Sequence, residues 1–452
     1  MPKRGSWRTR FGFYLVAIGS ACGLGNLWRF PYVVSENGGG AFVLLYLILA
    51  LAVGMPLLVA ELMIGKSTRK SILGITKQTS GQNQILFRWI ARASVVLTFV
   101  VLSYYAVISG WVLHFAMQFF AGLVRNTTID PNDFLRNLLG NGLLQVALAS
   151  VHLILAWLVV IKGVHEGLEK WIGNMMPLFV FLLIWLVFKS ISLDTFANSM
   201  RFLFYPDFSK LSYSSLISAL GHVFFTLSVG FGTMITFGSY FKETDHIPLA
   251  GFRVTIADTV ISLMAGLLVF PILLHQSQGR FADPTLLFEA LPRLLTQSRI
   301  GNLFGLAFFI CLYIAALGAS IGLFEVIVSN IVDRKKDIKR EKAAQWTGVG
   351  VLLVSTLPAF SSNFLRQFQI NGRGILELID VFLISWILPI VALGMSLGLS
   401  KVLDEKVMAA EFLAPNKVNS AALYGHWKIA LRYVIPGVII LGFLLELLGL
   451  IL

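Results

Sequence analysis

The chain is a series of long apolar runs separated by short polar connections. Eleven such runs lie at 11–33, 41–64, 88–120, 143–161, 167–191, 214–241, 247–274, 301–332, 343–359, 375–400 and 427–451. A helix needs about 20 apolar residues to cross the ~30 Å hydrocarbon core of a bilayer. The pattern therefore predicts an all-α polytopic membrane protein with 11 transmembrane helices, built as a single transmembrane domain over 1–452.

Composition and charge fix how this protein is expected to sit in the membrane. Of the 452 residues, 57% are hydrophobic and 13% are charged, about half the charged fraction of a typical soluble domain. Two thirds of the 36 Lys and Arg residues lie on the side of the spans that includes the amino terminus. Basic residues gather in cytoplasmic loops, so we expect a multi-pass plasma-membrane protein with its amino terminus inside and its carboxyl terminus outside. We expect no nucleic-acid partner.

Two of the apolar runs are interrupted by glycines. The first run contains GSACGLGN at 19–26, and the sixth contains LSVGFG at 227–232. Each glycine inside a helix costs about 1 kcal/mol relative to alanine. Close helix packing is one explanation, but two interruptions at corresponding positions of two halves indicate a transporter site near the midplane. We expect inverted repeats of five helices at about 11–191 and 214–400, with an extra helix at 427–451.

Several longer motifs carry a resemblance to a known family. They are GLGNLWRFPYVVSENGGGAF at 23–42, GMPLLVAELMIG at 54–65, YYAVISGW at 104–111 and FFTLSVGFG at 224–232. With these motifs, essentially the whole chain resembles the neurotransmitter:sodium symporter family, especially its bacterial amino-acid transporters. The resemblance implies a leucine-transporter-like fold, an inverted 5+5 repeat with broken helices 1 and 6 and the substrate at the two breaks.

The resemblance also implies a set of substrate-binding residues. They are Ala21, Gly23, Gly25, Val101, Tyr105, Phe225, Ser228, Phe231 and Leu323. The substrate carboxylate would meet the backbone near Gly23 and Gly25 and the Tyr105 hydroxyl. Transporters of biogenic amines have aspartate at the position of Gly23, so glycine favours an α-amino acid. Because the set contains no charged side chain, we expect a neutral substrate, apolar or aromatic.

The first sodium site implied by the resemblance contains one unusual ligand. Its positions are Ala21, Asn26, Thr226 and Asp258, where family members commonly have asparagine at the last position. Chloride-dependent members bind the anion at positions matching Tyr46, His222, Thr226 and Ser262. We hypothesise that Asp258 supplies the negative charge itself, so that no chloride is needed. The alternative is a protonated Asp258 that is hydrogen-bonded within the bundle.

The second sodium site implied by the resemblance is depleted. Three backbone carbonyls remain, from Gly19, Cys22 and Ala315, but the two hydroxyl positions fall on Gly318 and Ala319. A buried cation with too few ligands is unfavourable. We therefore expect this site to be weak or absent, with one sodium ion per cycle or a proton in place of the second. The alternatives are an alignment shifted by one residue, or completion of the site by Ser320 or water.

Charged pairs on either side of the expected site suggest two gates. The resemblance pairs Arg29 with Asp380 outside the substrate, and it places Arg4, Trp7, Tyr240 and Asp333 at the inner gate. Together these features predict a sodium-coupled symporter of a neutral amino acid that works by alternating access, as a monomer or weak dimer and not as an enzyme. The alternative is an amino-acid-binding sensor or a homologue whose coupling is lost or proton-based. Intact gates disfavour a channel.

Overall fold

The computed structural model describes residues 5–76, 83–125, 131–276, 286–295, 299–335, 337–370, 372–402, 404–413 and 421–451. Over these ranges the regular structure is helical, apart from one isolated β-bridge between Ile370 and Arg373. The arginine at position 4, which the sequence assigns to the inner gate, lies outside the described residues.

The helices follow one another with few irregular connections. The α-helices are α1 (Arg10–Ala21), α2 (Phe30–Glu36), α3 (Gly40–Leu49), α4 (Met55–Thr68), α5 (Ile72–Ile75), α6 (Asn83–Arg125), α7 (Pro131–Gly140), α8 (Gly142–Val160), α9 (Lys170–Ser190), α10 (Phe196–Phe204), α11 (Ser215–Thr226), α12 (Thr233–Gly238), α13 (Ile247–Gln276), α14 (Leu286–Leu295), α15 (Arg299–Arg334), α16 (Arg340–Ala359), α17 (Ile375–Val381), α18 (Leu388–Val402), α19 (Glu405–Leu413), α20 (Ala421–Ile429) and α21 (Ile435–Ile451). Short segments of other helical type are η1 (Gly25–Arg29), η2 (Ala50–Gly54), η3 (Val164–Glu169), η4 (Phe208–Lys210), η5 (Phe382–Ile387) and η6 (Ala430–Val434).

Most of the expected spans have the length and apolar character needed to cross a bilayer. Among the described residues, eight continuous helices do so, and a bent pair, Arg10–Ala21 with Gly25–Glu36, raises the number to nine. The expected run at 214–241 is divided between α11 and α12, and the run at 343–359 corresponds to α16, whose first turn is charged. The polytopic helical fold is confirmed, while the count of eleven stays a prediction.

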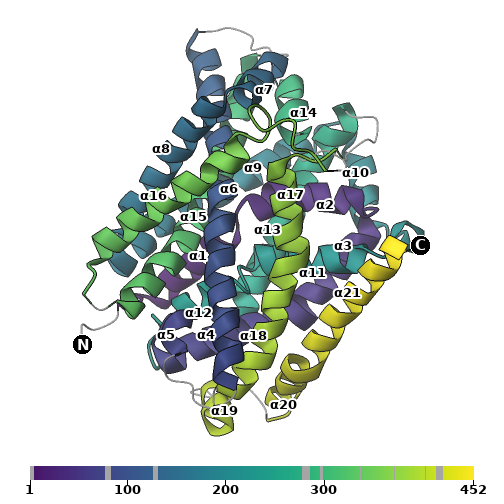
Figure 1. Ribbon diagram of the computed structural model, residues 1–452. Helices are drawn as coiled ribbons and strands as arrows, with labels where there is room; N and C mark the ends of the chain where they lie inside the picture. Colours follow the sequence, from purple (N-terminus) through teal and green to yellow (C-terminus); the bar gives the residue numbers. More distant parts are fainter. Residues whose placement is uncertain are drawn as a thin grey trace.

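The long helices surround the short ones. In Figure 1, α6 and the α17–α18 pair run through the front of the bundle, and α8 and α16 flank it on one side. In this view the short helix α12 lies to the left of α6, and α11 lies to the right of the α17–α18 pair, toward α21. α7 and α14 lie at one end of the bundle, whereas the amino terminus, α5, α19 and α20 lie at the opposite end. Most residues of α11 and α12 are buried within the bundle.

The first break follows α1 directly. α1 ends at Ala21, the next turn is irregular, and η1 and α2 then continue at an angle of 43° to α1. Gly23 is required here because a Cβ atom at this position would lie 2.3 Å from the Tyr105 hydroxyl oxygen. The predicted interruption is therefore present, and close approach of α6 is one reason for its glycine.

The second break is a six-residue connection between α11 and α12. Ser228, Gly230 and Gly232 have φ values of 53°, 87° and 76°, in the left-handed region that glycine tolerates better than other residues. The buried Glu61 carboxylate accepts the Gly230 N–H at 2.7 Å, and the Ser94 hydroxyl donates to the Gly230 carbonyl at 2.7 Å. Backbone groups freed from a helix inside a membrane need partners within the protein, and α4 and α6 provide them here.

Candidate functional site

The two breaks lie against each other in the middle of the bundle. The Ser228 hydroxyl donates to the Ser20 carbonyl at 3.3 Å, which joins the second break to the end of α1. On the other side, a Cβ atom on Gly25 would lie 3.0 Å from the Phe225 ring. Glycine at position 25 therefore lets the unwound part of the first span approach the aromatic end of α11.

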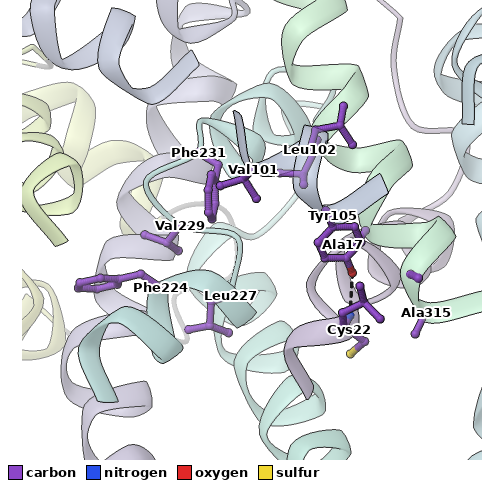
Figure 2. Close-up of a cluster of buried hydrophobic side chains, with 14 of the residues drawn as sticks. Ala17, Cys22, Val101, Leu102, Tyr105, Phe224, Leu227, Val229, Phe231 and Ala315 are labelled. Atoms are coloured by element: carbon purple, nitrogen blue, oxygen red, sulfur yellow. Dashed lines mark hydrogen bonds between the residues drawn. The ribbon is translucent and has the colours of Figure 1, made fainter. Parts of the chain in front are cut away.

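The structure brings the predicted substrate-binding residues together around these breaks. Tyr105 accepts the Leu24 N–H at 2.7 Å through its hydroxyl oxygen, which leaves the hydroxyl hydrogen available to another acceptor. The Phe225 ring lies 6.5 Å from the Tyr105 ring and 6.2 Å from the Phe231 ring, between centroids. Figure 2 shows the side chains of Phe231 and Val101 directed toward each other, and Tyr105 beside the turn that carries Cys22.

The α15 residues beside the breaks are also apolar. The Ala319 methyl group would lie 2.8 Å from a Cβ atom on Gly23. Leu323 follows Ala319 by four residues and therefore lies on the same face of α15. Both side chains are buried. The predicted set thus forms an apolar and aromatic surface beside exposed backbone, with no charged member.

A fully buried carboxylate joins the two breaks. Asp258 on α13 accepts hydrogen bonds from the Asn26 amide at 2.7 Å and from the Thr226 hydroxyl at 2.8 Å. The Tyr46 hydroxyl lies 3.5 Å from its other oxygen, and the Asn26 amide also donates to Ser262 at 2.9 Å. In the part of the chain that the structure describes, Asp258 forms no ion pair with a basic side chain. All three side chains assigned to the first sodium site are therefore in contact.

His222 lies beside this cluster in an apolar setting. Its ring is fully buried, 5.5 Å from the Phe30 ring and 5.3 Å from the Tyr46 ring between centroids. Neither of its ring nitrogens has a hydrogen-bond partner within the described ranges. The hydroxyls of Tyr46 and Ser262 are within hydrogen-bond distance of each other, at 3.3 Å. Three of the four positions that match a chloride site are thus grouped around Asp258.

The residues assigned to the second sodium site lie where α1 packs against α15. A Cβ atom on Gly318 would lie 2.6 Å from the Gly19 carbonyl oxygen, so the two backbones are in close contact. Ser320, which could have completed the site, instead lies 2.8 Å from the His152 ring on α8 through its hydroxyl. In this structure Ser320 is therefore engaged on the face of α15 turned toward α8.

The outer pair assigned from the sequence is formed. The Arg29 Nε lies 3.4 Å from an Asp380 carboxylate oxygen, and the Tyr104 hydroxyl donates to the other oxygen at 2.9 Å. Arg29 and Asp380 are only 4% and 7% exposed, and the Arg29 guanidinium lies 5.8 Å from the centre of the Phe225 ring. A cavity of about 580 Å³ lies over the pair and is lined by both residues.

The inner residues assigned from the sequence are partly brought together. The Trp7 indole donates to the Phe237 carbonyl at 3.1 Å, and its ring lies 5.6 Å from the Tyr240 ring. Asp333 accepts the Ser71 N–H at 2.7 Å. These contacts join Trp7 to α12 and the turn that follows it, and Asp333 to the residue before α5.

Four buried carboxylates were not assigned from the sequence: Asp245, which pairs with Arg10 at 3.2 Å, and three others. Glu61 supports the second break, as described above. Glu169 accepts the backbone N–H groups of Arg8 and Thr9 at 2.8 and 3.1 Å, and Glu325 accepts the Tyr240 hydroxyl at 2.6 Å while pairing with Arg340. In the sequence, each is visible only as an acidic residue within or beside an apolar run. That position does not identify the residue that it contacts.

Two interrupted helices that meet around a buried carboxylate, inside a scaffold of long apolar helices, define a membrane transporter of the leucine-transporter-like class. A model of the sodium:neurotransmitter symporter family matches residues 4–131 and 132–450. The chain belongs to this family, which consists of transporters and not of enzymes, and the resemblance inferred from the motifs is confirmed.

Individual relatives agree with this assignment. The chain is 32% identical to an uncharacterized sodium-dependent transporter, YhdH, of Bacillus subtilis (strain 168), over 97% of this chain and 96% of the relative. It is 31% identical to the sodium-dependent neutral amino acid transporter B(0)AT2 of Mus musculus, over 60% of this chain and 41% of the relative. The crystal structure of MhsT in complex with L-phenylalanine matches with a TM-score of 0.89 and 32% identity, covering 98% of this chain and all of MhsT.

Proposed function

We propose that this protein is a sodium-coupled symporter that carries a neutral amino acid into the cell by alternating access. One observation carries the proposal: the Asp258 carboxylate is buried and contacts both broken helices, through Asn26 from the first and Thr226 from the second. A charge in a membrane span marks a functional site by default. With no basic side chain paired to Asp258 in the described ranges, a transported cation is the partner that fits.

The chemistry of this cluster suits sodium. The proposed ligands are the side-chain oxygens of Asn26, Thr226 and Asp258 together with the Ala21 carbonyl, all hard oxygen donors of the kind that alkali cations prefer. Two unit charges 4 Å apart attract by about 4 kcal/mol at an effective dielectric constant near 20. The carboxylate provides this attraction within the protein, so we propose that transport does not require chloride.

The pocket beside the cluster suits an apolar or aromatic amino acid. The backbone around Gly23 and Gly25 and the Tyr105 hydroxyl would bind the substrate carboxylate. Phe225, Phe231 and the other apolar members of the predicted set would enclose its side chain. The phenylalanine bound to MhsT and the neutral amino acid named for the mouse relative support this class of substrate.

We propose that a single sodium ion drives each cycle. The second site would have only the carbonyls of Gly19, Cys22 and Ala315, and the close packing of Gly318 on Gly19 supports weak or no binding there. Because the second site has lost its hydroxyl ligands, a proton could also take the place of the second sodium ion in this proposal.

The closed pairs at the two ends support gating. Arg29 with Asp380 would close the outer path, and Trp7 with Tyr240, joined by position 4 and Asp333, would close the inner one. We place the amino terminus in the cytoplasm and the carboxyl terminus outside, in the plasma membrane. The inverted repeats would span about 11–191 and 214–400, and the protein would act as a monomer or weak dimer.

Uptake into proteoliposomes tests the proposal. Labelled phenylalanine should accumulate when sodium is high outside, and it should not accumulate when potassium replaces sodium. Asp258→Asn should weaken the sodium dependence, whereas the matched variant Asp207→Asn, at an exposed carboxylate in a loop, should not. Sodium-independent accumulation of every amino acid tested would refute coupling.

The alternative function is an amino-acid-binding sensor or a transporter homologue with lost or proton-based coupling. One feature favours it, the lack of hydroxyl side chains at Gly318 and Ala319. Counterflow separates the two functions. A transporter exchanges internal unlabelled amino acid for external labelled amino acid, whereas a pure sensor binds without flux. Uptake driven by an imposed pH gradient without sodium would identify proton coupling.

A further inference from the structure

A second cavity opens on the side of the bundle, apart from the substrate and ion residues. This lateral cleft has a volume of about 800 Å³ and lies between the start of α1, the η2–α4 segment, the start of α13 and the α19–η6 segment. The Trp427 indole of α20 donates to the Pro56 carbonyl of α4 at 3.0 Å and fixes one wall against another. The cleft is therefore part of the folded bundle.

The walls of the lateral cleft are apolar and open. Leu51, Leu249, Phe252 and Leu423 line it, and these side chains are 43%, 40%, 48% and 47% exposed. All four belong to segments that are long and apolar enough to cross a membrane: Leu51 to one, Leu249 and Phe252 to a second, and Leu423 to the start of a third. In a bilayer, such a surface contacts lipid chains.

The rim of the lateral cleft is basic. Arg10, Arg253, His246 and His426 line it, and no aspartate or glutamate is among its lining residues. Burial, followed by the positive charges of Lys66 and Arg10, lowers the pKa of His246. His246 is therefore neutral at neutral pH, and Arg10 and Arg253 are the permanently charged members of the rim.

Arg253 is the unusual member of this rim. It lies six residues after the first residue of α13, about 9 Å along the helix at a rise of 1.5 Å per residue. Its guanidinium lies 5.3 Å from the centre of the Tyr14 ring and donates to the Tyr14 hydroxyl at 3.4 Å. Arg253 forms no ion pair with an acidic side chain in the described ranges. A charge within a span needs a partner. For Arg253 we look for that partner in a bound ligand.

Arg10 faces the same opening from α1. Its guanidinium contacts Asp245 at 3.2 Å and donates to the Thr244 carbonyl at 2.7 Å. These contacts use two of the five N–H donors of an arginine side chain. The Arg10 side chain remains 62% exposed, so donors are available at the rim on the side opposite Arg253.

We infer that the lateral cleft binds an anionic phospholipid, with the phosphate between Arg10 and Arg253 and an acyl chain along Leu249 and Phe252. Guanidinium groups match phosphate in geometry and charge. Basic pockets between spans on the cytoplasmic side are typical of anionic lipid headgroups. The cleft includes α19 and α20, at the end of the bundle that carries the amino terminus (Figure 1). With the amino terminus in the cytoplasm, as proposed above, the lipid comes from the cytoplasmic leaflet.

Native mass spectrometry of the full-length protein in detergent tests the inference. The protein is titrated with phosphatidylglycerol, with phosphatidylcholine of the same acyl chains, and with glycerophosphate as a soluble headgroup. We expect saturable binding of phosphatidylglycerol to a first site and weaker binding of the other two. Loss of one arginine is expected to weaken this binding about fivefold, from about 1 kcal/mol per basic residue near a lipid surface.

Variants locate the binding within the protein. Arg253→Gln should weaken phosphatidylglycerol binding, and Arg253→Lys should restore most of it because the charge is kept. Arg432→Gln is the matched control, because Arg432 lies on η6, is exposed, and stacks on Tyr433 at 5.8 Å without lining the cleft. Thermal unfolding with and without sodium checks that each variant is folded. If Arg253→Gln does not fold, Arg10→Gln takes its place.

Three results would overturn the inference. Equal binding of phosphatidylcholine would mean that the headgroup charge is not recognised. Equal competition by glycerophosphate would mean that the site takes a soluble anion instead of a lipid. An equal loss of binding in the Arg253 and Arg432 variants would mean that lipid adsorbs to the basic surface in general.

Discussion

Asp258→Asn offers the sharpest test of the proposed ion site, because it removes one charge and keeps the shape of the side chain. The carboxylate accepts from Asn26 at 2.7 Å and from Thr226 at 2.8 Å, so a cation among these ligands would lie within a few ångströms of it. An interaction of about 4 kcal/mol at 4 Å corresponds to almost a thousandfold in affinity. This value is an upper limit, because the amide oxygen remains a ligand.

We therefore expect the half-saturating sodium concentration for uptake to rise at least about tenfold, or ~1.4 kcal/mol. Uptake of labelled amino acid into proteoliposomes is measured against sodium, first with chloride and then with gluconate as the anion. The wild type should be indifferent to the anion, whereas chloride should partly restore the variant through Tyr46 and Ser262. The reasoning fails if wild-type uptake collapses in gluconate, or if the variant keeps the wild-type sodium dependence.

Four further substitutions test other parts of the site. Tyr105→Phe removes the hydroxyl that accepts the Leu24 N–H at 2.7 Å and that is proposed to bind the substrate carboxylate. A hydrogen bond to a charged group contributes about 1.5–3 kcal/mol, so we expect amino-acid binding to weaken by about tenfold to a hundredfold. An unchanged dissociation constant in a competition assay would contradict the role. Glu61→Ala removes the acceptor of the Gly230 N–H and should lower the Tm measured with the substrate absent; an unaltered Tm would mean that the second break holds without it. Gly318→Thr would place a Cβ atom 2.6 Å from the Gly19 carbonyl oxygen, so it should abolish uptake although the protein is expressed at the normal level. Ala319→Ser adds one hydroxyl at the second sodium site, so it should lower the sodium concentration needed for uptake.

The sequence predicts the general architecture because each of its signals is local. Long apolar runs mark the spans, and glycines at 19–26 and 227–232 mark the breaks, since both features act through neighbouring backbone. Asp258 could be identified from its position in an apolar run, and the motifs supplied its partners Asn26 and Thr226. The family resemblance was needed for every pairing between distant residues.

The supporting contacts could not be derived in the same way. Glu61 is separated from Gly230 by 169 positions, and Glu325 is separated from Tyr240 by 85 positions, so no periodicity links either pair. The glycines predicted the division of 214–241 into α11 and α12, but not the positive φ of Ser228 within it. A serine in the sequence does not predict a positive φ. These features follow from tertiary packing.

The two interruptions differ in how firmly the surrounding helices hold them. Glu61, Ser94 and Thr98 tie the backbone of 230–231 to α4 and α6 with three hydrogen bonds. The backbone of the first break is tied to α6 by the Leu24 N–H to Tyr105, and the Asn26 amide bonds to Asp258 and Ser262, across the proposed ion position. A sodium ion there would act as a removable cross-link between a fixed half and a looser one. When the sodium ion leaves, the α1 side would be free to move while the α11–α12 side keeps its conformation. Release of the substrate would then begin with movement of the α1 side.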